Sequence, residues 1–148
     1  MKQIFKLIII ALITIPVFSF SQTKKEYIMV SYSSICCGTP SEKPIMDFVK
    51  KFEIENKLPP FEIFVEYGLG DEGEHAFYIG TDNLNPKSIK SFVKGLKITA
   101  TKQNNKRLKN RDGSVNVDDK LTLNATLKSI KNKPINQLNS LTIYNYKQ

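Results

Sequence analysis

The sequence predicts a small α+β domain in which two amphipathic helices cover one face of an antiparallel sheet. Segments of alternating apolar residues, typical of strands, occur on both sides of segments whose apolar residues follow i, i+3, i+4 and i+7 spacing, typical of helices. Two of the predicted strands are also close enough in sequence to form a hairpin. The length of 148 residues suits one such domain with a single hydrophobic core.

Residues 1–21 have the features of a secretory signal peptide. Lys2 and Lys6 precede an apolar run at residues 7–18. Ser19 and Ser21 provide small residues at positions −3 and −1 of a signal-peptidase site. We therefore expect cleavage before Gln22, a secreted or periplasmic location, and no transmembrane segment in the mature chain. An uncleaved membrane anchor is the alternative, because the apolar segment is almost long enough to span a bilayer.

The first strand is predicted over residues 27–35 (YIMVSYSSI), which are rich in β-branched and aromatic side chains. The first helix is predicted over residues 42–56. Its apolar residues at helical spacing are Ile45, Phe48, Val49 and Phe52. Thr39 is the expected N-cap, followed by a proline and, three residues after the cap, by Glu42. Ser41 is a rival cap, and two prolines end the helix.

Residues 61–67 and 74–79 are predicted to form a β-hairpin. The first segment alternates apolar and polar residues, and the connection at residues 68–73 (GLGDEG) is short enough for antiparallel pairing. This connection also matches the Gly-x-Gly-x-x-Gly pattern of dinucleotide sites. It leads into a strand, however, whereas a dinucleotide site needs a helix there, so we expect no cofactor.

A second helix is predicted to begin with Asn85 as N-cap and Pro86 in its first turn. Its apolar residues at helical spacing are Ile89, Phe92, Val93 and Leu96. Gly95 indicates that the helix stops soon afterwards. The alternating residues 96–101 (LKITAT) are then the predicted closing strand.

The resulting order of elements is that of a ferredoxin-like βαββαβ sandwich, with two helices on an antiparallel sheet. We assign this core to residues 22–102. Residues 103–148 are predicted to form a basic, β-rich C-terminal extension of the same domain, with candidate strands at 114–117, 121–127 and 141–146. The sequence leaves open whether these strands extend the sheet or pack as a separate layer.

The mature chain has a modest positive charge. Two of the 22 Lys and Arg residues leave with the leader, whereas all 14 Asp and Glu residues remain, so the net charge falls from +8 to +6. Export makes nucleic acid a poor partner, and we expect none. The charge is consistent with weak attraction to an anionic membrane surface. The expected partner is an unknown protein or small ligand outside the cytoplasm.

Cys36 and Cys37 are the only cysteines, and they lie in the predicted loop between the first strand and the first helix. A thiol beside a helix N-terminus has a stabilised thiolate, which favours nucleophilic chemistry and binding of soft metals. The placement resembles that in ferredoxin-like heavy-metal-binding domains and thioredoxin-like proteins, whose cysteines are spaced by two residues. Here they are adjacent. Overlay of residues 37–40 (CGTP) on a Cys-Gly-x-Cys site retains only Cys37 as nucleophile.

Cys36 and Cys37 are therefore the candidate residues for binding a ligand or a metal. The leading hypothesis is a non-enzymatic exported binding module centred on their loop. One alternative is a monothiol thioredoxin-like oxidoreductase that uses Cys37, and another is an interaction or inhibitor protein with structural cysteines. An adjacent pair can also close into a disulfide in an oxidising compartment. No catalytic residue is assigned, because the sequence supplies neither a hydrolase triad nor an acid–base pair.

Two other motifs gather possible cation ligands. The hairpin connection and the start of the strand after it contain Asp71, Glu72, Glu74 and His75. A solvated acidic loop is the preferred interpretation, because successive strand residues point to opposite faces. Residues 110–119 resemble a calcium loop of the EF-hand or dockerin kind, but Leu108 stands where the first carboxylate is expected. A tight turn at Asp112-Gly113 is preferred.

Overall fold

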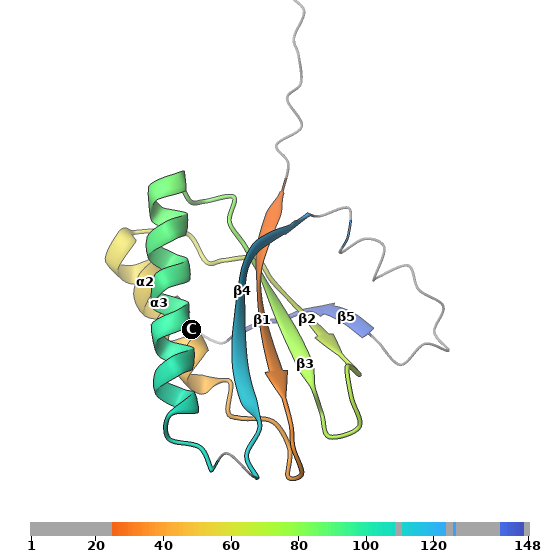
Figure 1. The fold of residues 1–148 in the computed structure, drawn as a ribbon. Helices are drawn as coiled ribbons and strands as arrows, with labels where there is room; N and C mark the ends of the chain where they lie inside the picture. The colour runs from red at the N-terminus through yellow and green to blue at the C-terminus, as the bar shows by residue number, and fades with distance from the viewer. Residues whose placement is uncertain (1–24, 109–110, 124–125, 127–139, 147–148) are drawn as a thin grey trace, which may run out of the picture.

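The computed structural model describes residues 25–108, 111–123, 126 and 140–146 (Figure 1). The predicted signal peptide and its cleavage site before Gln22 lie outside these residues. Within the described ranges, no helix is both long enough and apolar enough to cross a lipid bilayer.

Two helices pack on one face of a five-stranded antiparallel sheet, as Figure 1 shows. The elements are β1 (Glu26–Ser33), α2 (Lys43–Asn56), β2 (Ile63–Tyr67), β3 (His75–Gly80), α3 (Pro86–Asn104), β4 (Ser114–Leu123) and β5 (Ser140–Ile143). The strand order is β4-β1-β3-β2-β5, and each neighbouring pair runs antiparallel. The predicted α+β class is confirmed at this level.

The predicted closing strand at residues 96–101 is wrong, because these residues continue α3. Leu96 and Ala100 are buried one helical turn apart, so the segment also satisfies a helical pattern. Gly95 does not end the helix. It lies against Phe48 of α2, where a Cβ would collide with the Phe48 ring. The fourth strand of the sheet is β4, and the β4–β1 and β5–β2 pairings place both C-terminal strands in the sheet, at opposite edges.

The predicted cap of the first helix is also wrong. The N-cap is Glu42, and Pro44 lies in the first turn, whereas Thr39 remains in the loop. The Glu42 side chain does not cap the helix. It instead accepts a hydrogen bond from Tyr144 at 2.8 Å and lies 3.0 Å from Nε2 of His75. A carboxylate that the sequence assigned to the helix end thus joins α2 to β3 and to the segment after β5.

The main core lies between the sheet and the two helices. Phe92 of α3 is fully buried, and its ring centroid lies 4.9 Å from those of Phe52 on α2 and Phe61 before β2. These aromatic contacts fix α2 and α3 relative to the sheet. A second, smaller cluster on the opposite face of the sheet contains Tyr27, Ala76 and Tyr78.

Four tyrosines donate hydrogen bonds to glutamate carboxylates. The pairs are Tyr27 with Glu62 at 2.6 Å, Tyr78 with Glu66 at 2.7 Å, Tyr144 with Glu42 at 2.8 Å, and Tyr146 with Glu53. The phenol is the donor in each pair, so each contact requires a neutral tyrosine.

Titration of the folded protein should produce less tyrosinate at pH 10 than titration of the unfolded chain, as measured by ultraviolet absorbance. Burial, reinforced by nearby carboxylates, raises the pKa of all six tyrosines above the ordinary value of 10.0, that of Tyr144 to about 12. Their contribution to stability is therefore present below pH 10 and is lost as the pH rises through the raised values. Ionisation and unfolding, followed by circular dichroism, should coincide. Equal tyrosinate in the folded and unfolded chains at pH 10 would contradict the tyrosine contacts described above.

Candidate functional site

Three loops singled out by the sequence meet at one end of the sheet (Figure 1). Residues 34–42 connect β1 to α2 and contain both cysteines, residues 68–74 connect β2 to β3, and residues 111–113 lead into β4. They meet because β1 pairs with both β3 and β4, with Tyr32 opposite His75 in β3. We call these three segments together the loop end.

The sulfur atoms of Cys36 and Cys37 lie at disulfide distance, and both residues are exposed. With the sulfurs bonded to each other, neither is a thiolate, so neither serves as a nucleophile or as a thiolate metal ligand. Sγ of Cys36 lies 3.5 Å from the carbonyl oxygen of Arg111. Both cysteines lie in the loop between β1 and α2, as predicted, and α2 begins at Lys43.

Hydrogen bonds hold the loop end together on the side of α3. Gln103, in the last turn of α3, donates from Nε2 to the Ser41 carbonyl oxygen at 2.7 Å. Arg107 donates from Nη1 to the Asp112 carbonyl oxygen at 2.8 Å. Gly113 packs directly against the end of β1. The cysteine loop is thus fixed to the elements on either side of it.

A polar cavity of about 250 Å³ lies between residues 37–40 and the segments that follow α3. Lys106, Arg107 and Asp112 are the charged residues that line it. Arg107 has five N–H donors, and the described contacts use one of them, in the bond to Asp112. A guanidinium held in this way can present its remaining donors to a carboxylate or phosphate group.

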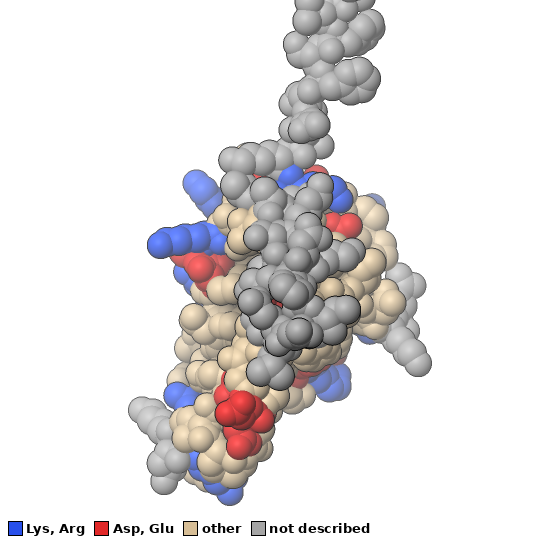
Figure 2. All heavy atoms as spheres, turned by 90° about the vertical axis from the view of Figure 1, so that its right-hand side faces the viewer, with Lys and Arg blue, Asp and Glu red and all other residues tan. Residues whose placement is uncertain are grey.

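The acidic hairpin connection folds back on itself. Glu74 accepts a hydrogen bond from the Glu72 N–H at 2.8 Å, and bonds from its own backbone N–H and from that of Glu72 lower the pKa of its carboxyl group. Figure 2 shows acidic side chains gathered towards the lower end of the molecule, where this connection lies in Figure 1. Over the described part of the chain, no group of three His, Cys, Asp or Glu residues is placed to hold a metal ion.

The segment that resembles a calcium loop is engaged in its own turn. The Asp112 carboxylate accepts hydrogen bonds from the Leu108 N–H at 2.8 Å and from Nε of Arg111 at 3.0 Å. Residue 110, the predicted third position of a calcium loop, lies outside the described residues. The described contacts therefore agree with the turn interpretation.

His75, the only histidine, is a buried residue behind the loop end. Its Nδ1 lies 2.9 Å from the Gly73 carbonyl oxygen, its Nε2 faces Glu42, and Tyr32 stacks on its ring with centroids 4.7 Å apart. Both nitrogens face oxygen atoms, and the described contacts of the ring include no cysteine. The described contacts therefore form no Cys–His pair of the kind that activates a thiol.

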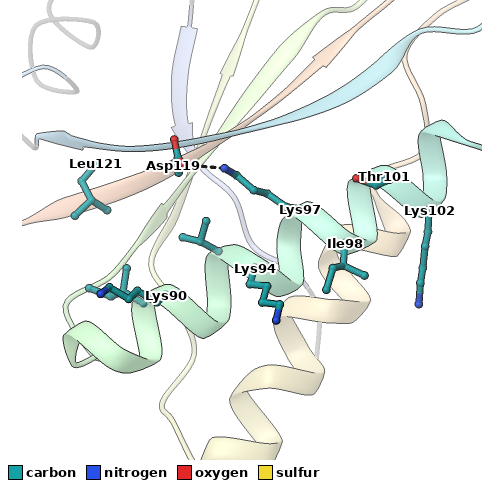
Figure 3. A pocket seen from close by; sticks show the side chains of 10 residues that line it. Lys90, Lys94, Lys97, Ile98, Thr101, Lys102, Asp119 and Leu121 are labelled. Atoms are coloured by element: carbon teal, nitrogen blue, oxygen red, sulfur yellow. Dashed lines mark hydrogen bonds and ion pairs between the residues drawn. The ribbon is translucent and has the colours of Figure 1, made fainter.

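A second hollow, of about 640 Å³, lies between α3 and β4 (Figure 3). We call it the α3–β4 groove. Its apolar lining is Ile89, Val93, Ile98 and Leu121. Its lysines are Lys90, Lys94, Lys97 and Lys102. The groove was not predicted from the sequence, although Lys90, Lys94 and Lys97 follow the i, i+4, i+7 spacing of one helix face.

Comparisons with protein-family models, with curated proteins and with solved structures give no match.

Proposed function

We propose that this protein is an exported, non-enzymatic binding module that holds a small anionic ligand at the loop end. The observation that supports this function best is the polar cavity that the cysteine loop lines together with Lys106 and Arg107. In this proposal the Cys36–Cys37 disulfide restrains the binding loop and does not react. Export follows from the signal-peptide features of residues 1–21.

The core of this module is ferredoxin-like. The strand order β4-β1-β3-β2 and the helices after β1 and β3 support this assignment, and β5 is then an addition at the β2 edge. In this arrangement the loop between β1 and α2 lies at one end of the sheet, where connecting segments on a rigid scaffold commonly carry binding residues.

An interaction or inhibitor protein is the second candidate function. Ile35, Leu69 and Leu108 are exposed in or beside the loop end, with relative accessibilities of 52%, 43% and 55%. Exposed apolar side chains around a restrained loop suit a protein partner. The two candidate functions differ in the size of the bound partner, a small anion or a protein. Both leave the disulfide intact.

Titration with inorganic phosphate and with citrate, followed by amide NMR shifts, tests the small-ligand proposal. We expect saturable shifts at Gly38, Thr39 and Gly113. The Arg107→Gln variant should bind about tenfold more weakly, because a charge-assisted hydrogen bond is lost. Lys87→Gln is the control for loss of one positive charge, since Lys87 of α3 does not line the cavity. Unchanged amide shifts with both anions would remove the proposal in favour of a protein partner.

The oxidoreductase and metal alternatives are tested on the reduced protein. A monothiol oxidoreductase would turn over a disulfide substrate, and Cys37→Ser would abolish that turnover. The binding proposal expects no turnover with either protein. A Cys36/Cys37 metal site would lose affinity for Zn(II) or Cu(I) when both cysteines are replaced by serine. Catalysis, or metal affinity that depends on the cysteines, would count against a purely structural disulfide.

A further inference from the structure

The α3–β4 groove leaves apolar side chains partly accessible at the surface. Ile89, Val93 and Leu121 are partly buried and only border the core, and Ile98 has a relative accessibility of 45%. Figure 3 shows Ile98 on the outward side of α3, between Lys94 and Lys102. The hollow of about 640 Å³ lies within the ~300–1,000 Å³ typical of small-molecule sites.

Positive charge surrounds this apolar lining. Helix α3 contains five lysines and no acidic residue. Lys97 reaches across to Asp119 of β4 at 2.8 Å, the contact drawn in Figure 3. For Lys90 and Lys94, the described residues supply no ion pair. Like charges one turn apart on a helix repel each other, and an anionic group bound between them would relieve that repulsion.

The combination of an apolar hollow and lysines selects one kind of ligand. A polysaccharide or a free phosphate would use the lysines but gain nothing from the isoleucine and valine side chains. A neutral alkyl chain would use the hollow but not the charge. We propose that the α3–β4 groove binds a single-chain anionic amphiphile such as a medium- or long-chain carboxylate. The alkyl chain lies over Val93 and Ile98, and the head group contacts Lys90 and Lys94.

Calorimetric titration of the mature, disulfide-bonded chain with octanoate, decanoate and dodecanoate tests the ligand class. Each buried methylene adds favourable transfer free energy, so affinity should rise by about tenfold for every two methylenes until the groove is filled. Butyrate and decanol should bind at least tenfold more weakly than decanoate, because each lacks one of the two interactions. Added salt should weaken decanoate binding.

Surface variants locate the site without disturbing the core. Lys94→Glu should weaken decanoate binding about tenfold, whereas Lys87→Glu, with the same charge change on the same helix outside the groove, should have little effect. Ile98→Ser should weaken binding and flatten the chain-length dependence. Ile54→Ser, at an isoleucine of α2 that is 78% exposed, is its matched control.

Two outcomes would overturn the proposal. Equal affinity for decanol and decanoate would remove the role of the lysines. Binding to anionic phospholipid vesicles without saturable binding of decanoate would replace the ligand site by a membrane-docking face of α3. Neither result bears on the loop end, because none of the residues varied here lines its cavity.

Discussion

Replacing Gly113 with alanine should lower the free energy of unfolding by about 3 kcal/mol. A Cβ at this position would overlap the Ser33 carbonyl oxygen and lie 2.9 Å from Cα of Ser34. These are backbone atoms, so no side-chain rotation can relieve the clash. The start of β4 would have to move away from β1 and break the 2.9 Å hydroxyl contact between Ser33 and Ser114. Urea unfolding followed by circular dichroism measures the loss, which corresponds to about 10 °C in Tm.

Gly95→Ala is the matched control for this prediction. Its added methyl group would meet the end of the half-buried Phe48 ring, and shifting a side-chain ring costs less than moving backbone atoms. Alanine also favours a helix over glycine by about 1 kcal/mol, which offsets the cost of moving the ring. We expect a change within ~1 kcal/mol. A Gly113→Ala protein as stable as wild type would mean that β4 does not approach β1 as closely as described.

Replacing Glu53 with alanine should cost about 2–3 kcal/mol of stability. Glu53 is buried on α2, and its Oε1 accepts hydrogen bonds from the Phe61 N–H at 2.7 Å and from the Tyr146 hydroxyl. Alanine removes the acceptor and leaves a cavity beside two donors. Glu53→Gln retains a carbonyl oxygen in the same place, so it should recover most of the loss.

Glu55→Ala, two residues further along the same helix, is the control for Glu53→Ala. Glu55 is exposed and lies 3.7 Å from Lys51 in an i,i+4 pair, which contributes at most about 0.5 kcal/mol. Thermal unfolding of the three variants compares them directly. If Glu53→Ala and Glu55→Ala were equally stable, the contacts of Glu53 with Phe61 and Tyr146 would not contribute to the fold.

The regular part of the fold is predictable because its signals are local. The apolar spacing in α2 and the alternation in β2 each reflect one buried face, which a single segment reveals. The segment 96–101 satisfies both the helical and the strand pattern. What distinguishes them is a contact with a residue far away in the sequence. Gly95, which resembles a stop signal, allows the Phe48 ring of α2 to approach α3. A glycine selected by packing cannot be told from a helix terminator in one sequence.

The candidate sites likewise contain some residues that the sequence identifies and others that only the fold brings together. The sequence identifies Cys36 and Cys37 as chemically notable, and the structure places them at disulfide distance. The sequence could not show which residues line the cavity beside their loop, because Lys106 and Arg107 reach it through the end of α3, where Gln103 bonds to Ser41. The lysines of α3 were visible at helical spacing, but the apolar partner from β4, Leu121, was not.

The hydrogen bonds of Tyr144 and Tyr146 to α2 have a consequence for the order in which the domain is completed. They join residues 102 and 93 positions apart in the chain, to Glu42 and Glu53 respectively. Contacts at such separations form late, because the intervening chain must be ordered first. While the chain emerges from the ribosome, α2 therefore lacks two of its partners until residues 144 and 146 have been synthesised. The packing of α2 is therefore complete only after residue 146 has been synthesised.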